Sequence, residues 1–160
     1  MEKINKKLFK QAVGNFLTGV IVIGIKSKEK YIGKTINSFS SLSLNPPLIL
    51  FSIDKKSSSI RKFKKNIFLS VNILNSKQEF ISKLFSEKES DWNSIKFKES
   101  KNNTPIINNC LSNIDCKIIE IIPKGDHKII ICKVLEASFN KEKKPLIYFN
   151  STYHKNNSGK

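Results

Sequence analysis

Hydroxyl and amide side chains gather between Gly33 and Ser43, which makes this segment the part of the sequence best suited to hold a polar ligand. The segment carries six such side chains: Thr35, Asn37, Ser38, Ser40, Ser41 and Ser43. Hydroxyl groups and free backbone N–H groups can bind a phosphate or the polar edge of a ring. On its own, however, a serine-rich segment is most often a solvated turn. Whether this segment indicates a binding site therefore depends on the segments that surround it.

A second hydroxyl cluster, Ser57-Ser58-Ser59, follows beside Lys55 and Lys56. The apolar run over 48–53 separates the two clusters and predicts a buried strand. Two clusters that flank one strand can converge on a single phosphate at the same end of a sheet. The second cluster also offers N-caps to a short helix expected at about 58–65, and a helix N-terminus favours anions. Together the clusters predict an anion site.

Apolar periodicity predicts the elements that would position these clusters. Apolar residues at three-to-four spacing predict a helix over 4–16, and Ser76 with Glu79 has the spacing of a capping box before a helix over 76–85. Short β-branched and apolar runs predict strands over 20–25, 31–36, 48–53, 67–74, 114–122, 128–138 and 145–149. The first two of these strands are expected to form a hairpin.

The order of the elements indicates a single domain of the mainly β class over residues 1–160. The strands do not alternate with helices, which favours an antiparallel barrel with helices at its ends over a Rossmann domain. No G-x-G-x-x-G follows a strand, and there is no P-loop. The polar residues 86–113 predict a loop, and the tail from about 154 is expected to be mobile.

The chain has a formal net charge of +16, which is typical of proteins that bind nucleic acid. Almost all of this charge comes from lysine, since Arg61 is the single arginine, and the lysines are scattered along the sequence. Arginine is the better reader of phosphates and bases, because its fork donates two parallel hydrogen bonds. We therefore expect no nucleic-acid partner, and a basic nucleic-acid-binding barrel is a minor alternative.

Cysteines and histidines are too few to predict a metal site or a disulfide framework. Cys110, Cys116 and Cys132 lack CxxC spacing, and His127 and His154 lie far apart in the sequence. The sequence has no run of about 18 apolar residues and no secretory signal. We therefore expect a cytoplasmic protein with no membrane contact.

Six motifs, in order over about residues 8–153, resemble those of the flavin reductase-like family, which has the FMN-binding split-barrel fold. Each motif is weak alone, and the set is specific. The motifs are Phe16-Leu17-Thr18-Gly19-Val20, Gly33 to Ser43 with Pro46-Pro47, Val71-Asn72-Ile73-Leu74, Phe85-Ser86, Gly125-Asp126-His127 and Pro145-Leu146-Ile147-Tyr148. One departure is Lys34, because the family often has an apolar residue at that position.

The resemblance implies an antiparallel Greek-key split β-barrel and an NAD(P)H-dependent flavin reductase. In such an enzyme a hydride passes from NADH or NADPH to FMN or FAD, and the cofactors carry the chemistry, so no catalytic acid or base is expected. Reduced flavin would then reach a flavin-dependent monooxygenase or another acceptor, and the enzyme would be a homodimer. The alternative is an FMN-binding electron-transfer flavoprotein of the same fold without its own nicotinamide site.

The resemblance also implies which residues form the site. The residues expected to bind flavin are Lys34, Thr35, Ile36, Asn37, Ser38, Ser41, Ser52, Ile53, Asp54, Ser57, Ser58 and Phe85. The residues expected to meet the nicotinamide are His127, Tyr148 and Tyr153. Trp92, the single tryptophan, is either a loop anchor or a lid over the flavin.

Overall fold

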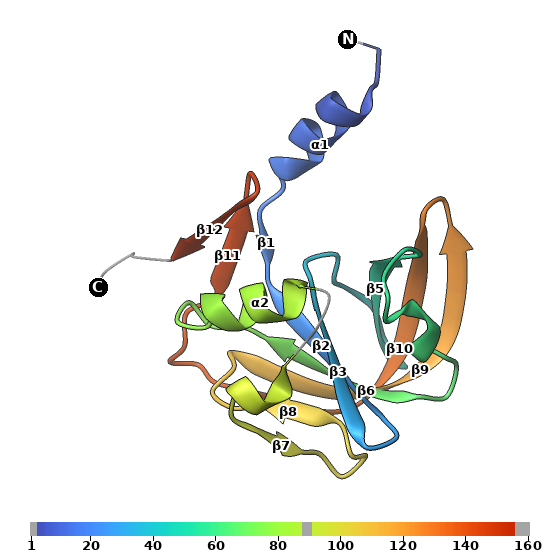
Figure 1. Ribbon diagram of the computed structural model, residues 1–160, viewed down its shortest axis with the longest axis vertical. Coiled ribbons are helices and arrows are strands. Elements are labelled where there is room, and N and C mark those ends of the chain that lie inside the picture. Colours follow the sequence, from blue (N-terminus) through green and yellow to red (C-terminus); the bar gives the residue numbers. More distant parts are fainter. Residues whose placement is uncertain (1–2, 88–90, 156–160) are drawn as a thin grey trace.

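This computed structural model describes residues 3–87 and 91–155 (Figure 1). The described residues contain twelve strands, two α-helices and two 3-10 turns. The strands are β1 (Thr18–Gly19), β2 (Ile21–Ser27), β3 (Lys30–Ile36), β4 (Ser40–Leu44), β5 (Pro47–Asp54), β6 (Phe68–Ile73), β7 (Phe97–Glu99), β8 (Pro105–Ile107), β9 (Ser112–Lys124), β10 (His127–Phe139), β11 (Leu146–Phe149) and β12 (Thr152–Lys155). The helices and turns are α1 (Lys6–Gly14), α2 (Glu79–Ser86), η1 (Ile60–Lys62) and η2 (Trp92–Ser94).

The main sheet is antiparallel, with the strand order β3-β2-β6-β9-β10-β5-β4. It curls, so that β3 at one end comes into contact with β5 near the other end. A small sheet of β1, β11 and β12 stands beside it, and β7 pairs with β8 (Figure 1). The predicted antiparallel, mainly β architecture and the β2–β3 hairpin are confirmed.

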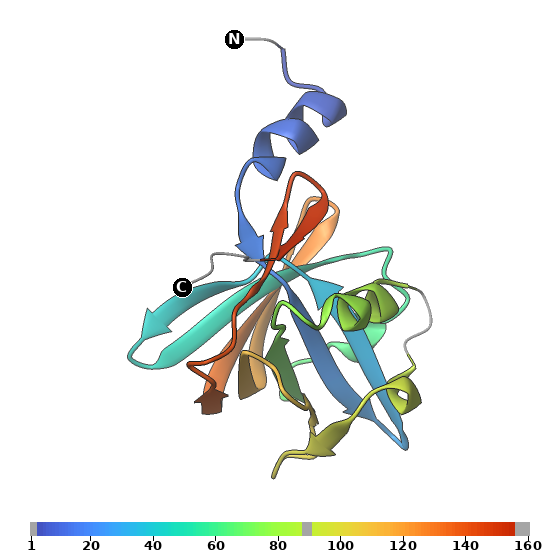
Figure 2. The ribbon, with the colours of Figure 1, turned by 90° about the vertical axis from the view of Figure 1, so that its left-hand side faces the viewer.

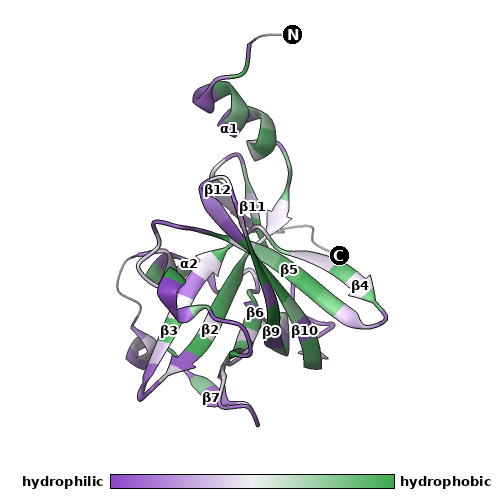
Figure 3. Cartoon of the chain, turned by 90° about the vertical axis from the view of Figure 1, so that its right-hand side faces the viewer, coloured by the Kyte–Doolittle hydropathy of each residue, from purple (hydrophilic) through white to green (hydrophobic). Residues whose placement is uncertain are grey.

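The strand β2 is buried on both faces, which explains its unbroken apolar run. Ile21, Ile23 and Ile25 pack into the interior of the curled sheet with residues of β5, β6, β9 and β10. Val22 faces the other way, into a second cluster that includes residues of α2. Figure 3 shows the hydrophobic colouring along β2 and β5. Since β3 pairs with β2 over its whole length, the hydroxyl-rich segment begins on a rigid support.

An aromatic cluster on the outer face of the curled sheet fixes α2 against β3. The ring centroids of Phe85 and Trp92 lie 4.7 Å apart, and those of Tyr31 and Phe97 lie 4.9 Å apart. Phe85 is fully buried against Gly33, where an added Cβ would come within 2.3 Å of the phenyl ring. Glycine at this position therefore allows the close approach of α2. Trp92 is buried in this cluster, so it anchors its loop and is not a lid.

The polar stretches hold more regular structure than their composition predicts. Residues 86–113 contain η2, β7 and β8, so the expectation of a loop there is wrong. The end of the serine-rich segment forms β4, an edge strand that pairs with β5. The chain turns back after Phe149 as β12, so the expected mobile tail does not begin at His154, and the rest of that prediction, 156–160, lies outside the described residues. Such edge strands depend on backbone pairing, which hydropathy does not reveal.

Two helix starts differ from the prediction. The helix expected over 58–65 is reduced to η1, where Ser59 makes no side-chain cap. A three-residue turn has almost no dipole, so the argument for an anion at its N-terminus is lost. The helix α2 begins at Glu79 without the predicted capping box, because Gln78 occupies the N-cap and Ser76 lies outside the helix.

The helix α1 stands away from the sheets (Figure 2). It lies within the predicted range 4–16, and none of its residues is buried. Phe9 and Val13 on the helix, and Phe16 just after it, are 56%, 52% and 76% exposed. This apolar face therefore has no partner within the described chain.

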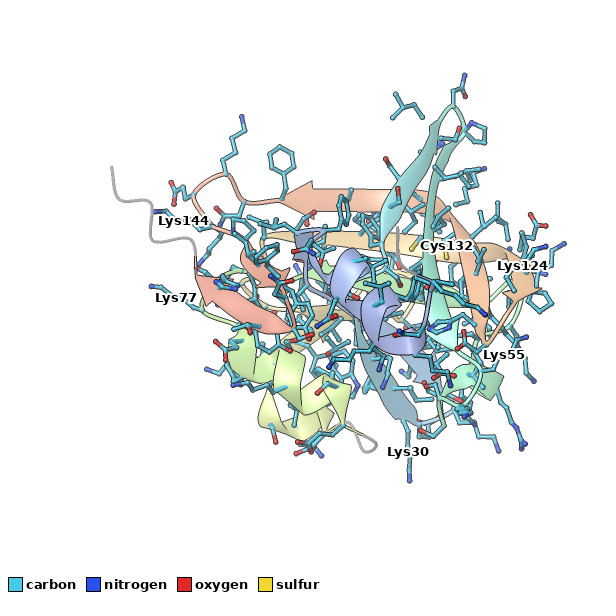
Figure 4. All side chains as sticks on the ribbon, turned by 90° about the horizontal axis from the view of Figure 1, so that it is seen from above. Lys30, Lys55, Lys77, Lys124, Cys132 and Lys144 are labelled. Atoms are coloured by element: carbon cyan, nitrogen blue, oxygen red, sulfur yellow. The ribbon has the colours of Figure 1, made fainter. Side chains whose placement is uncertain are left out.

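Lysines lie on several sides of the molecule. Figure 4 shows this for the labelled side chains of Lys30, Lys55, Lys77, Lys124 and Lys144. In the part of the chain that is described, no helix is both long and apolar enough to cross a membrane. Residues 3–87 and 91–155 also contain no group of three or more His, Cys, Asp or Glu placed to hold a metal ion.

Candidate functional site

A cavity of about 440 Å³, here named the first cavity, opens where β3, β5 and the start of β10 meet. Small-molecule sites usually measure about 300–1,000 Å³, so this volume suits a ligand of cofactor size. The lining residues are Lys34, Thr35, Ile36, Asn37, Ser38, Ser52, Ile53, Asp54, Lys56, Ser57, Ser58, Ser86, Glu87 and His127.

Strand pairing brings these residues together from distant parts of the sequence. The β2–β3 hairpin carries residues 34–36 to one wall, and the end of β5 carries residues 52–54 to the other. The strand β10 pairs with β5 so that His127 lies opposite Asp54. The backbone N–H of Lys55 donates to the carbonyl oxygen of Asp126 at 2.9 Å, which ties the two strand ends together.

Hydroxyl groups in the first cavity are partly fixed by the surrounding backbone. The Ser38 hydroxyl donates to the carbonyl oxygen of Ser52 and accepts from its N–H, both at 3.0 Å. The Thr35 hydroxyl donates to the carbonyl oxygen of Ser82 at 2.7 Å, and Thr35 lines the cavity. Within the described residues, the side chains of Asn37 and Ser58 make no hydrogen bond to protein. These two polar groups are therefore free to bind a ligand.

Charges of both signs surround the first cavity. Lys34 and Lys56 are its cations, and Asp54 and Glu87 are its anions. The Lys34 Nζ lies 3.5 Å from the carbonyl oxygen of Ser86 at the end of α2, which is a long and weak contact. The Asp54 carboxylate accepts a hydrogen bond from the backbone N–H of Lys56 at 2.8 Å. The lysine ammonium groups thus remain able to interact with a phosphate.

The ring of His127 is held at the edge of the first cavity by its neighbour. The Nδ1 of His127 lies 2.6 Å from Oδ1 of Asp126, and the histidine side chain is 44% exposed. This hydrogen bond and the charge of a protonated His127 hold the pKa of the Asp126 carboxyl below its usual range. The pairing fixes the orientation of a ring that still meets solvent, so the histidine can contact a second ligand.

Most of the predicted flavin residues line the first cavity, and four predicted site residues do not. Ser41 is exposed on β4, and Phe85 is fully buried under Gly33. Tyr148 on β11 and Tyr153 on β12 pack edge to face, with ring centroids 5.2 Å apart. The Tyr153 hydroxyl bonds to the Ser82 hydroxyl at 2.8 Å.

A separate cavity of about 440 Å³, between α1 and β11, contains one of these tyrosines. Tyr148 lines it together with Thr18, whose buried hydroxyl has no hydrogen-bond partner in the described residues. Asn37 lines both this cavity and the first cavity, so the two spaces adjoin at that residue.

Three lining residues were not among the predicted site residues: Lys56, Ser86 and Glu87. Lys56 directly precedes Ser57, which was a predicted site residue, so its position in the sequence could have indicated that it also lines the site. Ser86 ends α2, and Glu87 follows it into a stretch that was expected to be a loop. Their place in the site depends on how α2 packs on β3, which local sequence does not reveal.

The donor set of the first cavity fits a flavin nucleotide. Hydroxyls of Ser57 and Ser58 and two lysine ammonium groups can bind a phosphate. Asn37 and the backbone at residues 52–54 can bind the polar edge of a ring. The curled antiparallel sheet and this cavity together assign the protein to the class of flavin-binding split barrels.

Comparison with protein families matches residues 13–157 to the flavin reductase like domain. The FMN reductase (NADH) SmoA of Agrobacterium fabrum is 31% identical over 149 residues, which cover 93% of this chain and 85% of that protein. HsaB of Rhodococcus jostii, the reductase subunit of a flavin-dependent monooxygenase, is 31% identical over 153 residues, or 95% and 78% of the two chains.

A solved structure shows the same fold. Flavin reductase PheA2 superposes with a TM-score of 0.87 and 33% identity, over 95% of this chain and 98% of that chain. The chain therefore belongs to the flavin reductase-like family. The predicted split-barrel fold and the predicted enzyme class, a flavin reductase that uses a nicotinamide donor, are confirmed.

Proposed function

We propose that the first cavity binds the flavin of this reductase, with the phosphate at Ser57 and Ser58 and the ring beside residues 52–54. The two unbonded side chains of Asn37 and Ser58 and the cations Lys34 and Lys56 support this placement. Hydroxyl groups and ammonium groups at one end suit a phosphate, and backbone groups of a strand suit a flat ring. Thr35 and Ser38 lie between these two ends and would hold the ribityl chain.

The flavin supplies the hydride-accepting chemistry when it is bound, and the protein supplies binding and orientation. The Ser38 hydroxyl, fixed by the Ser52 backbone, would hold its ligand in one position. The His127 ring, oriented by Asp126, would bind the nicotinamide dinucleotide at the edge of the cavity. Alignment of two reactants within contact distance is itself a large part of catalysis, so no side-chain acid or base is required.

The pairing of His127 with Asp54 is the observation that carries this proposal. His127 and Asp54 are partners in one hydrogen-bonded ladder, which supports a nicotinamide contact beside the proposed flavin wall. Residues that face each other in such a ladder have Cα atoms about 4.5–5.5 Å apart. Two ligands bound at these positions would therefore lie next to each other.

The acceptor of reduced flavin that we propose is a flavin-dependent monooxygenase. Support comes from relatives such as HsaB, which is named as the reductase subunit of such an enzyme. We also propose a homodimer, because α1 exposes Phe9 and Val13, and the edge strand β4 exposes Leu42 and Leu44. The cytoplasm is the proposed location, since it supplies NADH and NADPH.

The reductase is tested by following NADH oxidation by the purified protein with added FMN or FAD. We expect turnover with flavin, and we expect His127→Ala to raise the KM for NADH about tenfold while flavin affinity changes less than about twofold. His154→Ala, which removes an exposed histidine on β12, is the matched control and should leave both values unchanged.

Three results would contradict parts of this proposal. Tight FMN binding without NADH oxidation would favour an electron-transfer flavoprotein of the same fold. Equal effects of His127→Ala and His154→Ala on the KM would remove the nicotinamide role of His127. Sedimentation of a single-chain mass at micromolar concentration would exclude the homodimer.

A further inference from the structure

A second cavity of about 190 Å³ continues from the phosphate end of the first. The two cavities share Lys34, Ser57, Ser58 and Glu87. Beyond these shared residues the second cavity extends to Ser59 and to Lys62 at the end of η1. A ligand whose phosphate lies at Ser57 and Ser58 would therefore face directly into this space.

The two cavities differ in charge. The first is lined by two lysines and two carboxylates, Lys34 and Lys56 with Asp54 and Glu87, so its formal charges balance. The second is lined by Lys34 and Lys62 with Glu87 as its one carboxylate, so positive charge is in excess. Since charged groups attract an anion most where they are not balanced, the second cavity is the better place for further negative charge.

The cations of the second cavity are available for a ligand. The side chain of Lys62 is exposed and makes no ion pair or hydrogen bond within residues 3–87 and 91–155. The side chain of Lys34 makes only the long contact of 3.5 Å to the carbonyl oxygen of Ser86 described above. The hydroxyl of Ser59 bonds to that of Ser57 at 3.0 Å, which links the serine cluster across the two cavities.

The size of the second cavity suits part of a ligand and not a whole one. Its volume of about 190 Å³ is smaller than the roughly 300 Å³ at which small-molecule sites begin. It therefore completes the first cavity and does not form a separate site. Its lining of hydroxyls and unbalanced ammonium groups is that of a phosphate subsite.

We infer that the second cavity binds the second phosphate of FAD, so that Lys62, together with Lys34, makes this chain select FAD over FMN. This inference rests on the proposed placement of the flavin in the first cavity. With the first phosphate at Ser57 and Ser58, the second phosphate of a diphosphate lies one bridging oxygen further along. FMN ends at the first phosphate and gains nothing from Lys62.

The test is the affinity of the purified protein for FMN and for FAD, measured by flavin fluorescence quenching. We expect Lys62→Gln to weaken FAD about tenfold and to change FMN less than about twofold. Arg61→Gln is the matched control, because it removes the same charge from the neighbouring exposed residue of η1 that lines neither cavity. Lys56→Gln, in the first cavity alone, should weaken both flavins equally.

A phosphate in the second cavity could also come from the nicotinamide donor, so KM values for NADH and NADPH are measured with FMN as acceptor. If Lys62→Gln raises only the KM for NADPH and leaves FAD affinity unchanged, the assignment to FAD is overturned. Equal losses for FMN and FAD, or equal effects of Lys62→Gln and Arg61→Gln, overturn it as well.

Failure of the proposed function is distinguishable from failure of this inference. If the wild-type protein binds FAD through Lys62 but oxidises no NADH, the proposed nicotinamide contact at His127 fails and the inference stands. If it oxidises NADH with both flavins and Lys62→Gln affects neither, the inference alone fails.

Discussion

Asn72 on β6 and Asn37 after β3 carry the same side chain and use it in opposite ways. Asn72 is fully buried, and its Nδ2 donates to the carbonyl oxygen of Val22 at 3.1 Å. Its Oδ1 accepts from the N–H of Ile107 and from Nδ2 of Asn113, both at 2.8 Å. Asn37 is exposed and lines the first cavity, with no side-chain hydrogen bond inside the described chain.

The same contrast holds for the regions around these two residues. Near Asn72, the buried carboxylate of Asp115 accepts hydrogen bonds from Thr104 at 2.8 Å and from Asn102 at 2.7 Å. At the first cavity, Ser58 has no hydrogen bond within the described residues. Polar atoms paired inside the protein stabilise the connection of β8 to β6, whereas polar atoms left open remain for a ligand. The motif that contains Asn72 is therefore structural.

The largest effect that would test this contrast comes from Asn72→Ala. The substitution leaves the buried N–H of Ile107 without a partner and removes the hydrogen bonds to Val22 and Asn113, so we expect a loss of about 3 kcal/mol in the free energy of unfolding. Asn37→Ala should change that free energy by less than about 0.5 kcal/mol while weakening flavin binding about tenfold. Urea unfolding and flavin titration measure the two quantities. Equal stability losses in both variants would contradict the comparison.

A smaller loss is expected from Gly33→Ala, which tests the packing behind the first cavity. The new methyl group would lie 2.3 Å from the ring of Phe85, so α2 has to move, at a cost of about 2 kcal/mol. Gly19→Ala is the control, because no atom lies within 4 Å of the corresponding position. Similar urea midpoints for the two variants would show that α2 is not held tightly against β3.

The smallest effect concerns the three cysteine thiols, all of which are buried as Asn72 is. Burial raises the pKa of the Cys110 thiol to about 12, and a hydrogen bond with the neighbouring Cys132 thiol, together with burial, raises the pKa of Cys116. Since the thiolate is the reactive form, we expect almost no reaction with a thiol reagent at pH 8 in the native protein. Three thiols should react after unfolding. Rapid labelling of the folded protein would contradict this burial.

The sequence predicts the core strands well because burial leaves a pattern. The run at 20–25 is apolar without interruption, since β2 is covered on both faces. The strand β4 lacks such a mark, because it is an edge strand whose residues are mostly exposed serine and leucine. The three-residue strands β7 and β8 are too short for alternation to show. Their stability comes from backbone pairing and from the Asn72 contacts, which local hydropathy does not contain.

The candidate site follows from the sequence only in part. The hydroxyl clusters are visible in the sequence, and both reach the first cavity. The pairing of β5 with β10, which brings His127 opposite Asp54, involves segments far apart in the chain, and periodicity cannot supply it. The roles expected for Phe85 and Tyr148 came from the family resemblance, which orders motifs along the chain without saying which side of a strand each residue faces. Lys62 carried no motif at all.

The ladder between β5 and β10 has a consequence for the rate of the reaction. Many enzymes must close a lid or a hinge before their reactants meet, and that motion can limit turnover. Here the proposed flavin wall and the proposed nicotinamide contact are joined by hydrogen bonds of one sheet, so their separation does not change between cycles. We therefore expect arrival and departure of the ligands, and not closure of the protein, to set the pace. Rapid-mixing traces in which flavin is bleached faster than steady-state turnover would show this.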